Sequence, residues 1–207
     1  MQPIFKTLLI AGTVALAIPN IANARGYKTT ITSPLTTSVK IEVVMSEDMQ
    51  HRANNLPKKL RDRSSGQSRG IRKGFTGNGF FGDRELDILS KSIEDQISRK
   101  LEGKGVVISE DAPVVLRITL EDAKNNRPTS EQLRRELNIS FQSFGLGGAE
   151  LSADLINADG TSLGTMHYKY YANTLQEGQQ FFGTWSDAKE TFGRFARKAT
   201  KTLVSQT

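Results

Sequence analysis

Between Asp83 and Gly103, large apolar side chains recur every three or four residues, which is the spacing of one face of an α-helix. The residues of this stripe are Leu86, Leu89, Ile93, Ile97 and Leu101. Asp83 is the expected cap of the helix, because its carboxylate can accept from the free N–H groups of the first turn. Gly103 and Gly105 are expected to end the helix. A helix with one apolar face has to bury that face against another part of the chain.

Alternation of apolar and polar residues predicts the strands of a sheet that covers this face. The alternation is clearest in Val39–Met45, Val114–Leu120 and Ala149–Leu155. Asn157–Gly160 predicts a tight turn after the last of these, since Asp-Gly tolerates positive φ. Residues 161–173 then return as the partner strand of a hairpin.

Two further segments have weaker patterns. Residues 105–109 are expected to form a short strand or the entry to one, and residues 137–144 form a candidate strand through Leu137, Ile139 and Phe141. Residues 131–137 just before it are equally compatible with a helical turn.

A second helix is predicted from about Ser186 to Val204. Thr184 and Ser186 are its candidate caps, and Thr184-x-x-Asp187 resembles a capping box. The expected buried face contains Ala188, Phe192, Phe195, Ala196, Ala199 and Leu203. The sequence therefore predicts an α+β fold, with an antiparallel sheet of about four or five strands and two main helices packed on one face.

The N-terminus has the features of a secretory signal peptide. Lys6 gives a positive charge, Thr7–Pro19 is mostly apolar, and Ala22–Ala24 is a small-x-small cleavage pattern. The apolar run is short for a membrane span, which needs roughly 20 residues; a retained N-terminal anchor is the alternative. We expect residues 1–24 to be removed after Ala24, which predicts a periplasmic protein that is not an integral membrane protein.

Behind the signal peptide we expect an extended segment at residues 25–37 and a single α+β domain at residues 38–207. The chain has no cysteine, which excludes disulfides, thiol catalysis and a lipid-modified cysteine as an anchor. Its two histidines, His51 and His167, lie far apart without a metal-ligand motif around them, so no metal or cofactor is expected. No motif for a catalytic nucleophile occurs, and the chain is predicted not to be an enzyme. The enzyme alternative would centre on His167 and Glu150.

Residues 47–82 are polar, glycine-rich and without period, which predicts a long loop after the first strand. Within it, Gly77–Gly82 matches the G-x-G-x-x-G pattern of dinucleotide-binding turns. Such a turn needs a buried strand leading into the first glycine. The preceding residues are basic and broken by glycine, so we interpret the motif as a helix entry.

The positive charge of the chain, +6 in total, is concentrated in this loop. A run of basic residues, opposed only by Asp62, is followed by a pair of phenylalanines. Together they form a candidate interaction surface: Lys58, Lys59, Arg61, Arg63, Arg69, Arg72, Lys73, Phe80 and Phe81. A solvated loop whose aromatic residues fold back onto the core is the alternative. For an exported protein, the available anions are phospholipid headgroups, lipopolysaccharide and acidic polymers, so the expected partner is an envelope protein or an anionic membrane surface and no nucleic acid.

Several segments resemble a family of uncharacterised secreted and lipoprotein domains of Gram-negative bacteria, the DUF3313-type domains. They are "HRANNLPKKLRDR", "GFTGNGFFGDRELDIL", "LEDAKNNRPT", "SFGLGGAELSADLINADG" and "TWSDAKETFGRFARK". The matching positions, within Val39–Leu203, are Gly147, Gly148, Asp159, Gly160, Trp185, Asp187, Ala188 and Phe192. The resemblance implies an α/β unit of the cell envelope without an assigned activity. Many relatives have a cysteine for a lipid anchor, and this chain does not.

These observations favour a periplasmic, non-enzymatic envelope protein that binds or scaffolds another envelope component. The alternative is a carrier that holds a lipid or a small apolar ligand between the sheet and the helices. The carrier hypothesis predicts an apolar cavity lined by Leu86, Ile93, Phe192 and Phe195.

Overall fold

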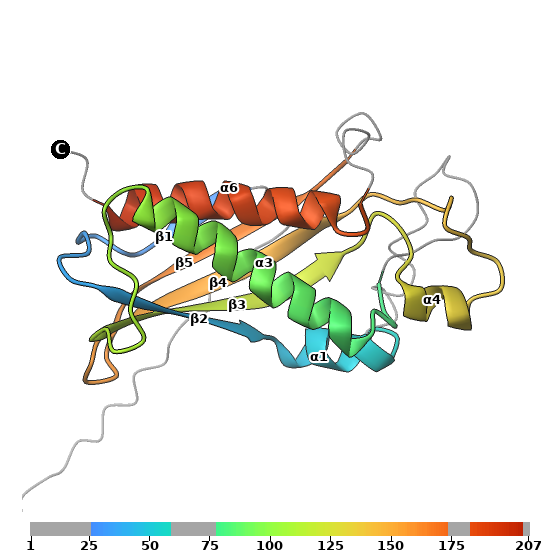
Figure 1. Cartoon of the computed structure of the whole chain (residues 1–207), viewed down its shortest axis with the longest axis horizontal. Helices are drawn as coiled ribbons and strands as arrows, with labels where there is room; N and C mark the ends of the chain where they lie inside the picture. Colours follow the sequence, from blue (N-terminus) through green and yellow to red (C-terminus); the bar gives the residue numbers. More distant parts are fainter. Residues whose placement is uncertain (1–25, 59–77, 174–182, 205–207) are drawn as a thin grey trace, which may run out of the picture.

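The computed structural model describes residues 26–58, 78–173 and 183–204. Five strands form one sheet in the order β1-β5-β4-β3-β2. Helices α3 (Asp83–Glu102) and α6 (Ser186–Leu203) lie side by side across one face of it (Figure 1). The strands are β1 (Gly26–Thr29), β2 (Val39–Met45), β3 (Val114–Lys124), β4 (Gly148–Ile156) and β5 (Ser162–Tyr171). The predicted α+β fold with two main helices on the sheet is confirmed.

The sheet is mixed, because β2 and β3 run parallel while the other neighbouring strands are antiparallel. The connection from β2 to β3 contains the long helix α3, which returns the chain to the starting end of the sheet before β3 begins. Parallel neighbours need such a crossover connection. Alternation within a strand says nothing about the direction of its neighbour, which is why the sequence predicted an antiparallel sheet.

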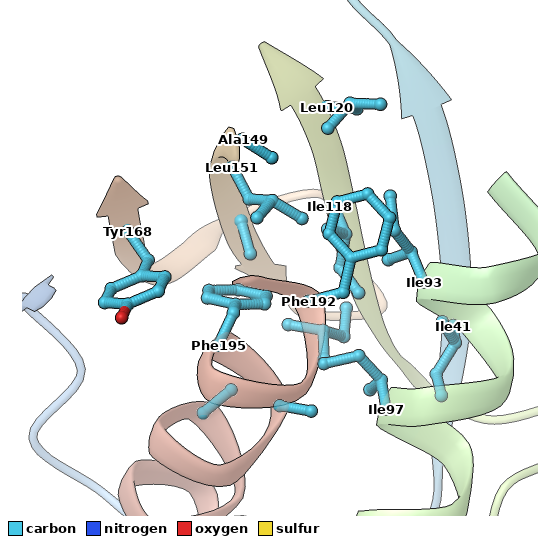
Figure 2. Close-up of a cluster of buried hydrophobic side chains, with 14 of the residues drawn as sticks. Ile41, Ile93, Ile97, Ile118, Leu120, Ala149, Leu151, Tyr168, Phe192 and Phe195 are labelled. Atoms are coloured by element: carbon cyan, nitrogen blue, oxygen red, sulfur yellow. The ribbon is translucent and has the colours of Figure 1, made fainter. Parts of the chain in front are cut away.

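The core lies between the two helices and the sheet. Helix α3 contributes its whole predicted stripe, from Leu86 to Leu101, and α6 contributes Phe192 and Phe195, which are at most 1% exposed. Figure 2 shows the two phenylalanines between α6 and the strands, facing Ile118 and Leu151. The opposite face of the sheet is polar and carries Glu and Lys side chains from β2, β4 and β5.

The expected loop at residues 47–82 begins with a helix instead, α1 (Glu47–Asn54). The Ser46 side chain caps it by accepting from the N–H of Met49, and Met49 and Ala53 are buried on one face. Glu47 and Asp48 in the first turn favour the positive end of the helix dipole. With only two apolar residues, this helix has no long stripe, so its period does not stand out in the sequence.

Two weaker strand predictions are wrong. Of residues 105–109 only Ile108 forms an isolated bridge, with Val39 of β2. Residues 137–144 form turns and irregular structure. The helical alternative before them is confirmed as α4 (Ser130–Arg135), capped by a Thr129–Gln132 capping box. The apolar residues of 137–141 alternate without a neighbouring strand to pair with, so alternation alone did not make a strand there.

The predicted caps of the two main helices also differ from the structure. Helix α3 starts after Gly82, which has φ of 87° and no side chain to cap with, and Asp83 is the first helical residue. Helix α6 follows Trp185, also without a side-chain cap. The Thr184–Asp187 capping box is therefore not formed. Asp187 is buried and bonded to residues far away in the sequence.

Candidate interaction surface

The described part of the glycine motif, Asn78–Gly82, closes the C-terminal end of α1. The N–H groups of Phe80, Phe81 and Gly82 donate to the carbonyls of Asn55 (3.1 Å), Arg52 (3.2 Å) and Ala53 (2.8 Å). These carbonyls would otherwise be the free acceptors at a helix end. A Cβ on Gly79 would lie 2.5 Å from the Asn55 carbonyl oxygen, so only glycine permits this approach. The N–H groups that a phosphate would need in a nucleotide site are used by the helix.

Helix α4 holds the same segment from the other side. Gln132 donates from Nε2 to the Gly79 carbonyl (2.7 Å), and its Oε1 accepts from Asn125 Nδ2 (2.7 Å) and the Thr129 N–H (2.9 Å). Gln132 is 1% exposed. Because one buried amide ties three segments together, the return of the chain from residues 59–77 is joined rigidly to α4.

Asp187 at the start of α6 is the centre of a second buried polar cluster. Its Oδ2 accepts from Asn126 Nδ2 (2.6 Å) and from the Gly147 N–H (2.9 Å), and its own N–H donates to Asn126 Oδ1 (2.9 Å). Asp187 and Asn126 are 3% and 4% exposed. The cluster connects the end of β3, the start of β4 and the start of α6.

A β-bulge in β3 changes which side chains reach the polar face of the sheet. The register shifts between Leu120 and Asp122, so both Glu121 and Asp122 have partners on this face: Glu121 accepts from Ser152 Oγ (2.5 Å). Asp122 accepts from the Tyr171 hydroxyl and, at 2.5 Å, from Nη2 of Arg52. Burial, together with the Asp122 carboxylate, holds the pKa of Tyr171 well above its ordinary value, so its hydroxyl remains a donor.

Next to this pair, Glu150 of β4 bridges two residues of β5. Its Oε1 lies 2.9 Å from His167 Nε2, and its Oε2 lies 2.6 Å from Lys169 Nζ. The pKa of Glu150 is lowered to about 2, mainly by the hydrogen bond with His167. Lys169 lowers it further, whereas burial opposes the shift. A carboxylate of such low pKa is a weak base. His167 and Glu150, the centre of the enzyme alternative, are thus brought together as a hydrogen-bonded group on the sheet face.

We expect the Glu150 pair to give a measurable loss of stability in acid. Because the pKa of Glu150 falls from about 4.5 to about 2 on folding, its contribution is complete above pH 4.5 and is lost as the pH falls toward 2. The contribution is on the order of 1–2 kcal/mol after solvent screening. Urea unfolding at several pH values should show that the free energy of unfolding changes less over this window in Glu150→Gln than in the original protein.

The matched control is Glu42→Gln, because Glu42 pairs with Arg117 at 2.8 Å on the same face, where both side chains are more than a third exposed. This variant should keep the acid-dependent loss. If the free energy of unfolding of Glu150→Gln depends on pH as steeply as that of the original protein, other carboxylates cause the acid sensitivity.

The most exposed apolar side chains of the described residues follow α4. Leu137 is 98% exposed and Phe141 77% exposed. Three arginines lie in the neighbouring segments: Arg127 Nη1 donates to the Phe141 carbonyl (3.2 Å), and Arg134 and Arg135 lie in the last turn of α4. We call this group, Arg127, Arg134, Arg135, Leu137 and Phe141, the α4 surface. Figure 1 shows α4 and the segment after it at one end of the long axis of the molecule.

The structure separates the residues of the predicted interaction surface. Lys58 is exposed, and the basic residues from Lys59 to Lys73 lie outside the described residues. Phe80 is half-buried with the Arg135 guanidinium 4.7 Å above its ring. Phe81 is 1% exposed and packs edge-on against Trp185, with ring centroids 5.1 Å apart, so it belongs to the core and is unavailable to a partner. Its placement agrees with the alternative in which the aromatic residues fold back onto the core.

The residues that the carrier hypothesis placed around a ligand, Leu86, Ile93, Phe192 and Phe195, belong to the continuous cluster of buried hydrophobic side chains. A ligand held among them would have to displace packed side chains. Packing of this kind stabilises the domain and leaves the carrier hypothesis without a specific observation in its favour.

Arg52, Asp122 and the α4 surface were missed at the level of the sequence. Arg52 lay in the expected loop, although Ser46 followed by two acidic residues, with Met49 and Ala53 four apart, is a recognisable helix start. Asp122 gave no signal as a partner of Arg52, because a bulge leaves no simple pattern in the sequence. Leu137 and Phe141 were assigned to a strand, and their exposure depends on the absence of a pairing neighbour.

Residues 26–58, 78–173 and 183–204 contain neither a candidate metal site nor a candidate membrane-spanning helix. No group of three or more His, Cys, Asp or Glu side chains in these ranges is arranged to hold a metal ion. No helix formed by them combines the length and the apolar character that crossing a membrane requires.

Comparison with known proteins gives only distant similarity. No family model and no curated protein matches the chain. Among solved structures, the PelC dodecamer from Paraburkholderia phytofirmans has 12% identity and a TM-score of 0.43 over 88% of this chain and 99% of that one. A minor lipoprotein from Acinetobacter baumannii has 13% identity and a TM-score of 0.32 over 81% of this chain and 91% of that one. At these values no role or assembly is inferred from either structure.

Proposed function

We propose that this chain is an exported, non-enzymatic protein of the Gram-negative cell envelope that binds or scaffolds another envelope component. The contact region is the end of the molecule that carries the α4 surface and both attachment points of the basic run. One observation carries the proposal. The Gly79 carbonyl is bonded to Gln132 of α4 at 2.7 Å and the Phe80 ring lies under the Arg135 guanidinium, so the chain that follows the basic run meets the domain at α4, which leads into the exposed Leu137 and Phe141.

The basic run is joined in the sequence to this segment. Between Lys58 and Lys73 the sequence has seven basic residues and only Asp62 as an acid. Positive charge next to exposed apolar side chains suits an anionic membrane surface or an acidic envelope protein. The expected signal peptide delivers the chain to the compartment in which both occur.

The polar groups on the sheet face support a non-enzymatic role. Both carboxylate oxygens of Asp122 and both of Glu150 accept from side chains of the protein. A general base needs a lone pair that is open to the substrate. These carboxylates are used to join strands and α1 to one another. The alternative function, a carrier of a lipid or small apolar ligand, would require the core to open.

The proposal is tested by removing the charge of the basic run. In one variant, glutamine replaces the seven residues Lys58, Lys59, Arg61, Arg63, Arg69, Arg72 and Lys73. We expect it to fold normally and to lose most of its retention when the mature protein is mixed with isolated cell envelopes and sedimented. Retention should also fall with increasing salt, because exposed charges are screened.

A matched control removes the same number of charges elsewhere. Glutamine replaces seven exposed basic residues outside the α4 end: Lys28, Lys91, Arg99, Lys100, Lys104, Arg197 and Lys201. This variant should be retained like the original protein. An equal loss of envelope retention in both variants would mean that only the net charge of the protein matters, and would contradict the proposal. Unchanged retention in both variants would also contradict it, because the basic run would then be a spacer.

A further inference from the structure

The segment after α4 exposes apolar side chains in a way that the fold does not require. Leu137 and Phe141 are 98% and 77% exposed, and Phe144, three residues further, is 38% exposed. Single exposed apolar residues are common on protein surfaces. Two nearly free large side chains within five positions form a local concentration, and such patches mark sites of contact.

The backbone of this segment is held in place by its own hydrogen bonds. The N–H of Ser143 donates to the Ser140 carbonyl (2.8 Å), and the N–H of Ser140 donates to Ser143 Oγ (3.0 Å). Arg127 holds the Phe141 carbonyl, and the Gly145 N–H donates to the Asn126 carbonyl (2.8 Å). A compact turn therefore presents Leu137 and Phe141 outward from the end of the domain.

The charge beside the turn is positive. Glu131 is shared by Arg134 (3.2 Å) and Arg135 (2.8 Å). With Arg127 and Glu136, the segment from Arg127 to Phe144 carries three arginines and two glutamates, so one positive charge is in excess. The side chain of Arg134 is 76% exposed. Each guanidinium has five donors, and these contacts use only a few of them. The remaining donors suit phosphate oxygens, which arginine binds through two parallel hydrogen bonds.

We propose that the α4 surface binds the interface of an anionic lipid bilayer, with Leu137 and Phe141 inserted at the boundary between headgroups and acyl chains and Arg127, Arg134 and Arg135 facing lipid phosphates. The proposal rests on the proposed function and names the membrane surface as the partner. An apolar tip with flanking cations is the arrangement by which peripheral proteins lie on membranes. Each added cation near an anionic surface strengthens the attraction.

A protruding turn favours a lipid surface over a protein partner or a second copy. A protein would need a concave, preformed pocket to cover two isolated side chains, whereas lipids rearrange around a convex tip. A second copy would also bring three arginines against three arginines. Like charges brought together in this way oppose association.

The test measures flotation of the mature protein with vesicles of phosphatidylglycerol and phosphatidylethanolamine, compared with vesicles of phosphatidylcholine alone. We expect binding to the anionic vesicles, with a part that persists at high salt because apolar insertion is not screened. The double variant Leu137→Ser/Phe141→Ser should bind about tenfold or more weakly and lose the salt-resistant part. Both positions are exposed, so the variant should fold and unfold like the original protein.

The control variant is Leu163→Ser, because Leu163 is also exposed, at 46%, but lies at the opposite end of the sheet beside the β4–β5 turn. It should bind the vesicles normally. Unchanged vesicle binding by the double variant would overturn the inference. So would envelope retention without any binding to protein-free vesicles, an outcome that leaves the proposed function intact and makes the partner a protein. Conversion of an oligomer to a monomer by the double variant, without an effect on vesicle binding, would assign the surface to a second copy.

Discussion

Replacing Asp187 by alanine is expected to lower the free energy of unfolding by about 3–5 kcal/mol. The substitution leaves the buried Gly147 N–H without its acceptor and removes the shorter of the two bonds of Asn126 Nδ2, which also donates to the Gly145 carbonyl (3.3 Å). Each unsatisfied buried donor costs about 1–3 kcal/mol, and bonds to a charged group lie at the upper end of the range. Urea unfolding of the mature chain, followed by circular dichroism, measures the loss.

Two further variants separate the hydrogen bonds from the effect of removing a side chain. Asp187→Asn keeps one oxygen in position to accept from both donors, so it should lose clearly less stability than the alanine variant. In a double-mutant cycle, Asn126→Ala and Asp187→Ala should be non-additive, because both remove the 2.6 Å bond between Asn126 Nδ2 and Asp187 Oδ2. Additive losses would mean that Asp187 acts only as a space-filling residue at the start of α6.

Replacing Phe81 by alanine is expected to cost about 3–5 kcal/mol, the range for a large buried aromatic side chain. Phe81 is 1% exposed, contacts the Trp185 ring edge-on and has the Arg52 guanidinium 5.7 Å from its ring. The substitution opens a cavity between α1, α3 and the start of α6 and removes these contacts. Thermal unfolding should show a correspondingly lower transition temperature.

Phe80 is the matched control, since it is the adjacent residue of the same type and is only half-buried. Its main described contact is the stacked Arg135 guanidinium at 4.7 Å, so Phe80→Ala should cost about 1 kcal/mol. Similar losses in the two variants, or a tolerated Phe81→Ala, would contradict the placement of Phe81 in the core. A large loss of stability at Phe81 alone would confirm that, of the two phenylalanines, only Phe81 belongs to the core.

Asp187 and Phe81 both stabilise the end of the molecule that presents the α4 surface, through different segments. Asp187 fixes the start of β4 next to α6, and Phe81 fixes the return of the chain from the basic run next to α1. Loss of either contact would loosen the end that presents the α4 surface. Variants that test binding should therefore leave both residues intact, as the glutamine and serine variants proposed above do.

Much of the fold followed from periodicity in the sequence. Leu86 to Leu101 repeat at helical spacing over about four turns, and the alternation of Val114 to Leu120 has no competing period. Long repeats of this kind arise because one face of each element is buried, so the pattern records the burial directly. Asn157–Gly160 likewise marked the β4–β5 turn, because the geometry of a tight turn restricts the residues that it accepts.

The candidate site was less accessible to sequence reasoning. The basic run could be recognised, but its relation to Leu137 and Phe141 depends on the docking of Gly79 against α4. Phe81 was assigned to the surface because it lies in a glycine-rich stretch, whereas Trp185, which covers it, is distant in the sequence. Short elements such as α1 and α4 bury too few residues to leave a period, and their caps were their only signal.

The sequence by itself determined the α+β class, the two main helices, the β4–β5 hairpin and the predicted export of the chain. Each depends on a local pattern in which neighbouring residues share one environment. Only the tertiary structure decided the parallel pairing of β2 with β3, the bulge that turns Glu121 and Asp122 to one face, and the use of the glycine motif to close α1. These features depend on contacts between residues far apart in the chain. Such contacts contribute to the free energy of folding but produce no periodic pattern of residues in the sequence.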